Sequence, residues 1–157
     1  MRTKSLLQLL LISVMAPGSI LWATHTGFTE HAISTSANEA TSVYAADVDG
    51  DGDMDVLSAS YRDDKIAWYE NNGSESFTEH VISTSADEAS SVYAVDVDGD
   101  GDMDVLSASI NDNKIAWYEN DGSESFTEHA ISTSADGAKS VFAADVDGDG
   151  DMDVLSA

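Results

Sequence analysis

The sequence predicts an all-β protein built from repeated four-stranded antiparallel sheets. Two observations lead to this fold class: the chain repeats with a period of 49 residues, and each unit contains short apolar runs separated by Asp/Gly-rich loops. Residues 28–76 and 77–125 are identical at 41 of 49 positions, and residues 126–157 match 77–108 at 27 of 32. Repeats of about 40–50 residues are typical of propellers and solenoids.

The apolar runs of each unit have the length and composition of β-strands. In the second unit and the start of the third they are residues 91–96, 104–110, 114–119 and 126–132. β-branched and aromatic side chains are frequent in them, and Asp, Asn and Gly separate them. No segment has a 3.6-residue apolar period long enough for a helix. Several runs are apolar at consecutive positions, which suits sheets covered on both faces, so we expect the blades of a β-propeller.

The repeats predict an incomplete ring or a fragment of a larger propeller. Two complete units and a partial third cannot close a ring of about four to eight blades. Apolar blade faces would then be exposed to solvent. Because the units are nearly identical, we expect self-association through these open blade faces.

Residues 1–23 have the layout of a secretory signal peptide. Arg2 and Lys4 precede an apolar run over residues 6–15, and small residues follow it. The run is too short and too often interrupted for a membrane anchor, which needs about 20 apolar residues. We expect cleavage between residues 18 and 24 and a secreted product, extracellular or periplasmic, with no stable membrane insertion.

The composition excludes several classes of function. The formal net charge is −24, from 30 acidic and 6 basic side chains, which disfavours nucleic acid and anionic membrane surfaces as partners. The absence of cysteine rules out disulfide-stapled modules, thiolate zinc sites and a lipid anchor on cysteine. Hydrophobic residues make up 42% of the chain, too many for a disordered acidic polymer.

Half of the acidic residues lie in three copies of one loop, D-V-D-G-D-G-D-M-D, at residues 47–55, 96–104 and 145–153. Five carboxylates within nine residues repel one another unless a cation lies between them. Six to eight oxygen ligands on a tight, glycine-containing loop suit Ca²⁺. We therefore expect about one calcium ion per loop, three in total.

The spacing assigns a role to each aspartate of the first loop. Asp47, Asp49 and Asp51 are predicted side-chain ligands at positions 1, 3 and 5. Asp53 would give its backbone carbonyl, and Asp55 would close the cage at position 9. The equivalent predicted ligands in the other two loops are Asp96, Asp98, Asp100, Asp102, Asp104, Asp145, Asp147, Asp149, Asp151 and Asp153.

Three alternatives to these calcium sites fit the sequence less well. A solvated acidic turn without metal does not explain three copies with unchanged spacing, and Mg²⁺ prefers strict octahedral geometry and retains its waters. An EF-hand needs Glu at position 12 and flanking helices. The chain has Ser58, Ser107 and Ser156 at that position, and the residues after each loop are predicted strands.

The segment S-V-Y-A-A-D-V-D-G-D-G-D-M-D-V-L-S-A-S at residues 42–60 resembles the FG-GAP repeat, also known as the VCBS repeat. The resemblance covers residues 28–157 and implies the seven-bladed propeller fold of integrin α chains and many secreted bacterial proteins. It also implies calcium at the three aspartate sets, in the hairpin between the two innermost strands of a blade. Phe-Gly is absent before Ser42, and Ser-Ala-Ser at residues 58–60 replaces Gly-Ala-Pro. The chain therefore looks like the bacterial-type variant, and integrin ligand recognition is not carried over.

The resemblance also sets the limits of the blades. With Ser42 in the innermost strand, one blade spans residues 42–83 and the next spans 91–132. Residues 140–157 supply two strands of a partial blade. Residues 28–34 would then form an outermost strand of a preceding blade.

Other recurrent residues are expected to be structural. One histidine recurs in each unit, at His31, His80 and His129. This recurrence is expected when a whole repeat is duplicated, and it does not require a functional site. Trp68 and Trp117 occupy fixed strand positions, which favours packing between blades over a sugar-stacking surface.

No catalytic arrangement stands out from the repeat background, so we do not expect an enzyme. The sequence favours a secreted calcium-binding scaffold for binding or adhesion, with a protein or glycan ligand and structural calcium. The alternatives are a carbohydrate-binding propeller and an accessory repeat region of a larger secreted hydrolase or lyase.

Overall fold

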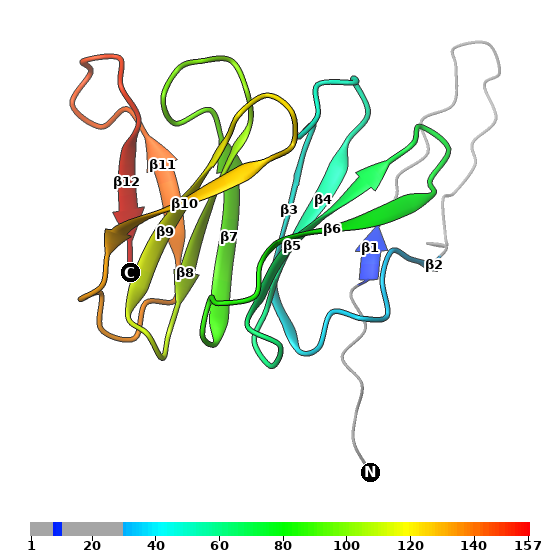
Figure 1. Cartoon of the computed structure of the whole chain (residues 1–157), viewed down its shortest axis with the longest axis horizontal. Helices are drawn as coiled ribbons and strands as arrows, with labels where there is room; N and C mark the ends of the chain where they lie inside the picture. The colour runs from blue at the N-terminus through cyan, green and yellow to red at the C-terminus, as the bar shows by residue number, and fades with distance from the viewer. Residues whose placement is uncertain (1–7, 11–29) are drawn as a thin grey trace, which may run out of the picture.

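A computed structural model of the protein describes residues 8–10 and 30–157, and within them every regular element is a β-strand. Two four-stranded antiparallel sheets, in the orders β3-β4-β5-β6 and β7-β8-β9-β10, stand side by side, with the hairpin β11–β12 next to the second (Figure 1). The strands of the first sheet are β3 (Ala40–Ala46), β4 (Asp55–Ser60), β5 (Lys65–Asn71) and β6 (Phe77–Ser83). Those of the second are β7 (Ala89–Val95), β8 (Asp104–Ser109), β9 (Lys114–Asn120) and β10 (Phe126–Ser132). The predicted all-β architecture of propeller blades is confirmed.

The hairpin β11 (Val141–Ala144) and β12 (Asp153–Ser156) provides two strands of a third unit. The four-stranded sheets extend over residues 40–83 and 89–132, so each begins two residues before the blade limit expected from sequence. This third unit falls within the segment 140–157, for which two strands were expected.

The segment before the first blade forms a short ladder of its own. Strand β2 (Glu30–Ala32) pairs antiparallel with β1 (Gln8–Leu10). The described part of the predicted outer strand 28–34 therefore has β1 as its hydrogen-bonded neighbour. Apart from β1, the predicted signal peptide over residues 1–23 lies outside the described residues.

Strands in the middle of each sheet are buried on both faces, which explains why they lack apolar/polar alternation. All six residues of β4 and of β8 are buried. Leu57 and Trp68 of the first blade lie in one core cluster with Val105 and Tyr118 of the second. A second cluster joins the opposite face of the second blade, which carries Leu106, to the β11–β12 hairpin. The core therefore consists of layers between consecutive blades.

A bulge in the innermost strand adds a hydrogen bond between neighbouring blades. The register of β3 with β4 shifts between Ala40 and Ser42, which leaves Thr41 unpaired in the ladder. The Thr41 hydroxyl donates a hydrogen bond of 2.8 Å to the carbonyl of Ala89 in the next blade. Ser90, which lies at the corresponding bulge in β7, donates one of 2.9 Å to the carbonyl of Ala138.

We predict that two substitutions at the same repeat position differ in their effect on stability. Leu57 is fully buried, whereas Leu155 is 42% exposed. Leu57→Ala leaves a cavity between two blades and should lower the free energy of unfolding by about 2–5 kcal/mol. Leu155→Ala should lower it by about 1 kcal/mol or less because that side chain remains largely in water. Urea unfolding of both variants checks the prediction, and equal losses would contradict the observed order of the blades.

Candidate metal centres

The three aspartate loops connect the two innermost strands of successive units. They join β3 to β4, β7 to β8 and β11 to β12, and all three lie at the same end of the blades, at the top of Figure 1. Gly50 and Gly52 adopt φ angles of 76° and 95° in the first loop, a backbone region that residues with a side chain rarely enter. The glycines therefore allow the tight path that brings alternate aspartates together.

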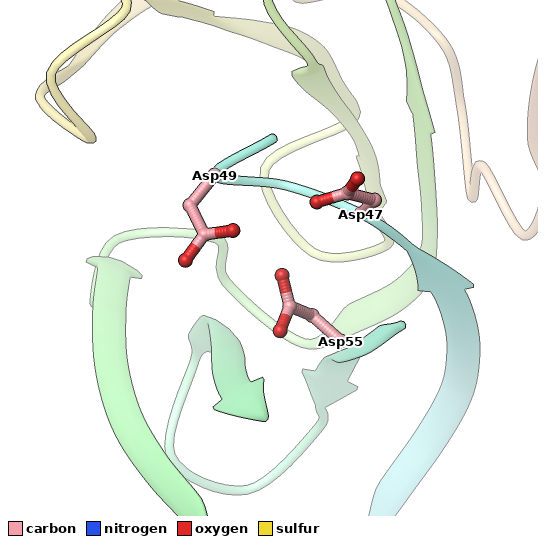
Figure 2. Close-up of side chains that lie close together, drawn as sticks. All are labelled: Asp47, Asp49 and Asp55. Carbon is pink, nitrogen blue, oxygen red and sulfur yellow. The ribbon is translucent and has the colours of Figure 1, made fainter. Parts of the chain in front are cut away.

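Three aspartates of each loop converge on one point. In the first loop Asp47 comes from the end of β3, Asp49 from the loop itself and Asp55 from the start of β4, and their carboxylates point toward one another (Figure 2). One carboxylate oxygen from each of the three lies within 4.8 Å of the others. The same clustering recurs at Asp96, Asp98 and Asp104, and at Asp145, Asp147 and Asp153. Within residues 30–157 the structure thus contains three clusters of carboxylates, each of which could hold a metal ion.

The other two aspartates of each loop lie outside these clusters. Asp51 Oδ1 accepts a hydrogen bond of 2.8 Å from the backbone N–H of Asp53. The Asp53 carboxylate lies against Gly73 in the β5–β6 turn, where a Cβ atom would collide with it. Their expected contributions, the Asp51 side chain and the Asp53 carbonyl, stay predictions. The same holds for the equivalent residues Asp100, Asp102, Asp149 and Asp151.

One buried oxygen of the first cluster has no hydrogen-bond partner among the described residues. Asp47 Oδ2 accepts the Gly52 N–H at 3.0 Å, but Asp47 Oδ1 is buried and unpaired. A buried carboxylate oxygen without a donor is costly unless a cation takes that place. The orphaned oxygen therefore fits a metal ion, and the all-oxygen donor set suits a hard cation.

Asp55 and its equivalent Asp104 are the buried members of their clusters. Asp55 Oδ1 accepts the Asn71 N–H at 2.7 Å, and Oδ2 accepts the Val48 N–H at 2.9 Å. Burial raises the pKa of Asp55 above its ordinary value; these two hydrogen bonds oppose the shift, and the negative charge of Asp49 adds to it. The carboxylate is thus both a cluster member and the bridge between the loop and β5.

Asn71 and Asn120 are residues of the site that the sequence reasoning missed. The Asn71 side-chain amide donates to the Met54 carbonyl at 3.2 Å, while its backbone N–H holds Asp55. Asn120 repeats both contacts with Met103 and Asp104. The signal in the sequence was an asparagine at the 49-residue period directly after Trp-Tyr-Glu.

The third cluster differs because, among the described residues, β11 and β12 form a two-stranded sheet without a third strand. Asp153 is exposed, and its Oδ2 accepts the Val146 N–H at 3.0 Å. Among the described residues no donor reaches Asp153 Oδ1 in the way that Asn71 and Asn120 reach the equivalent atoms. The third cluster is therefore less firmly held than the first two.

The recurrent aromatic residues have structural positions. Trp68 is 1% exposed and lies in the core between the first two blades, so its expected packing role is confirmed and it offers no surface for stacking on a sugar. His80 stacks on Trp68 with ring centroids 4.5 Å apart and pairs with Glu70 at 2.8 Å. His129 makes the equivalent pair with Glu119 in the second blade.

Comparison with protein families agrees with the repeat architecture. The FG-GAP-like repeat matches three times, over residues 7–58, 47–107 and 96–156. No curated protein matches the chain. Within the described residues, no helix has the length and apolar character needed to cross a membrane. With matches over most of its length, and with propeller-type blades that carry an aspartate loop between their inner strands, the chain belongs to the FG-GAP-like repeat family.

Proposed function

We propose that the chain is an exported, calcium-stabilised β-propeller repeat scaffold that binds a protein or glycan outside the cytoplasm and performs no catalysis. The observation that carries the proposal is the threefold recurrence of one carboxylate cluster at the same end of successive units. FG-GAP-like repeats are typical of extracellular proteins, which agrees with the export signal expected at residues 1–23.

Calcium suits these clusters better than other metals do. Asp47, Asp49 and Asp55 would hold the ion, with equivalent residues in the other two loops. Carboxylate and carbonyl oxygens are ligands of hard cations, and no histidine or cysteine belongs to any of the three groups. Calcium tolerates irregular coordination, whereas magnesium demands a near-ideal octahedron and keeps its waters. When bound, calcium would supply positive charge among carboxylates that otherwise repel one another.

The structure indicates what such binding would stabilise. Each cluster ties the ends of the two innermost strands together, and Asp55 and Asp104 also hold the third strand of their blade. An ion that binds only the folded loop adds its binding free energy to the stability of the blade. Extracellular modules of this kind bind calcium with dissociation constants of about 10⁻⁴–10⁻³ M. The scaffold would therefore be rigid where calcium is abundant.

We predict that the exported protein lacks its N-terminal segment. Expression of the full-length sequence in a secreting bacterial host should deliver the chain to the periplasm or medium with a new N-terminus between residues 18 and 24. Intact-mass measurement and N-terminal sequencing of the recovered protein check this expectation. A variant with Arg2 and Lys4 both replaced by Glu should be exported less, because the positive n-region is lost. Recovery of an uncleaved chain from the cytoplasm alone would contradict the proposed export.

The scaffold role itself is tested by binding to immobilised ligands. The calcium-loaded chain is applied to a panel of extracellular-matrix proteins and to a glycan array, with the EDTA-treated chain as control. We expect calcium-dependent retention on at least one surface. Absence of retention on every surface, by a chain shown to be folded, would count against a binding or adhesion role.

A further inference from the structure

The inner strand of the first blade presents an uncovered apolar face. Val43 in β3 is 47% exposed, whereas its equivalents Val92 and Val141, one and two repeats later, are 4% and 5% exposed. The difference has a simple origin: a preceding blade covers Val92 and Val141, and no blade within residues 30–157 covers Val43. Ala45, the next residue on the same face of β3, is exposed as well. We call this surface, made by Val43 and Ala45, the leading face.

The opposite end of the stack presents a second uncovered apolar face. Leu155 in β12 is 42% exposed, although Leu57 and Leu106 at the same repeat position are fully buried. Phe142 in β11 is 48% exposed and ends a row of aromatic rings, with its centroid 4.8 Å from that of Tyr93. We call this surface, made by Phe142 and Leu155, the trailing face.

The chain itself shows what fits each of these faces. Between the first two blades, the surface that carries Leu57 covers the surface that carries Val92. Between the second blade and the β11–β12 hairpin, the surface that carries Leu106 covers the one that carries Val141. We propose that a second copy of the chain docks head to tail, with the trailing face of one copy packed on the leading face of the next. The occupant is thus defined by two examples of the same interface in one molecule.

The sizes of the two open faces are also compatible with this contact. The rest of this face of the first blade is already covered, since Val56 in β4 and Tyr69 in β5 are buried in a cluster with Ile33 and Phe77. The inner strand with Val43 is the part left open. The β11–β12 hairpin likewise consists of the two inner strands of a blade. Within the chain, the two inner strands β3 and β4 both lie against β7, the innermost strand of the next blade. The two strands of the hairpin can therefore cover the single strand β3 that is left open.

Charge at the proposed interface favours this alignment of the two copies. In the internal interfaces the hydroxyls of Thr41 and Ser90 donate to the backbone of the next blade. Lys139 takes their place at the trailing end, where it is exposed. If the 49-residue repeat is continued from one copy into the next, Lys139 of the first copy lies against the Ala40 carbonyl of the second copy. Glu39 of the second copy is then beside it. A cation at this position reduces the repulsion between two chains of net charge −24.

Such an interface is heterologous, because two different surfaces meet. It leaves one leading and one trailing face free in every open assembly, so association can continue beyond a dimer. An interface of a face with itself would stop at the dimer. This difference makes the proposal testable with two single variants.

The experiment is sedimentation velocity of the full chain in calcium over a range of protein concentrations. The wild-type chain should form dimers and larger species as concentration rises. Val43→Asp destroys the leading face and Leu155→Asp destroys the trailing face, so each variant alone should remain monomeric. An equimolar mixture should form a heterodimer and stop there, because one intact leading face meets one intact trailing face. Val81→Asp, at an exposed position on the outer strand β6, is the matched control and should associate like the wild type.

Each other outcome overturns the proposal. A wild-type chain that stays monomeric has no such interface, and a single variant that still dimerises uses a face paired with itself. Circular dichroism confirms that the variants are folded. Lys139→Glu provides an independent check at an exposed site: it should weaken association about tenfold at low salt, and the loss should shrink at high salt. Unchanged association of Lys139→Glu would overturn the proposed register. None of these outcomes depends on whether the loops bind calcium.

Discussion

Removal of calcium with EDTA is expected to lower the melting temperature of the chain by about 10–15 °C relative to the protein in about 10 mM calcium. The expectation follows from the three carboxylate clusters that tie β3 to β4, β7 to β8 and β11 to β12. A site with a dissociation constant of about 10⁻³ M contributes about 1.4 kcal/mol at that calcium concentration, so three sites contribute about 4 kcal/mol. For a domain of this size, each kcal/mol corresponds to about 2–4 °C.

Differential scanning calorimetry of the same sample in calcium, in EDTA and after calcium is restored measures this effect. Magnesium at the same concentration is the matched control and should recover less than half of the shift, because the clusters suit a larger, less strictly coordinated ion. A melting temperature that does not change on chelation would show that the aspartate loops are acidic turns without a stabilising metal.

The second large effect is expected from Asp104, and it does not require calcium. Its carboxylate is fully buried and accepts the backbone N–H groups of Asn120 at 2.8 Å and Val97 at 3.0 Å. Asp104→Ala leaves both donors buried without a partner, so we expect a loss of about 3–5 kcal/mol of unfolding free energy even in EDTA. Asp104→Asn keeps oxygen and nitrogen atoms of similar size in place and should cost less.

Asp153→Ala is the matched control for this effect. Asp153 has the same position in the repeat and belongs to the third cluster, but it is exposed and accepts one of the two hydrogen bonds. Its removal in EDTA should cost about 1 kcal/mol or less. Urea unfolding of the variants in EDTA separates the hydrogen-bonding role of the carboxylate from its role toward calcium. Equal losses for Asp104→Ala and Asp153→Ala would contradict the structural role assigned to the buried residue.

Much of the fold could be predicted because the same unit recurs along the sequence. The period of 49 residues defines the unit, and the strand expected at residues 126–132 has the observed limits of β10. The inner strands begin earlier than expected, at Ala40 and Ala89. The reason is the bulge at Thr41 and Ser90, where an unpaired polar residue interrupts the apolar run but the strand continues beyond it.

The candidate sites could be located from sequence, but their internal organisation could not. Spacing along the loop predicts a ligand role for all five aspartates, whereas the fold brings only Asp47, Asp49 and Asp55 together and turns Asp53 toward the β5–β6 turn. Asn71 reaches the site from a strand 16 residues beyond Asp55, a contact that depends on the pairing of β4 with β5. Sequence identity between the loops also conceals a difference in burial: Asp153 is exposed in the two-stranded sheet β11-β12, whereas Asp55 and Asp104 are buried in four-stranded sheets.

The three candidate calcium sites are tested by a calorimetric titration of calcium into the chelator-treated full chain. We predict up to three binding sites, with the third loop weaker than the first two because Asp153 is exposed and held by a single backbone donor. Asp49→Asn, Asp98→Asn and Asp147→Asn should each remove one site while the other sites keep their affinity. Absence of saturable binding, or a stoichiometry that none of the three substitutions changes, would contradict the assignment of the aspartate loops as calcium sites.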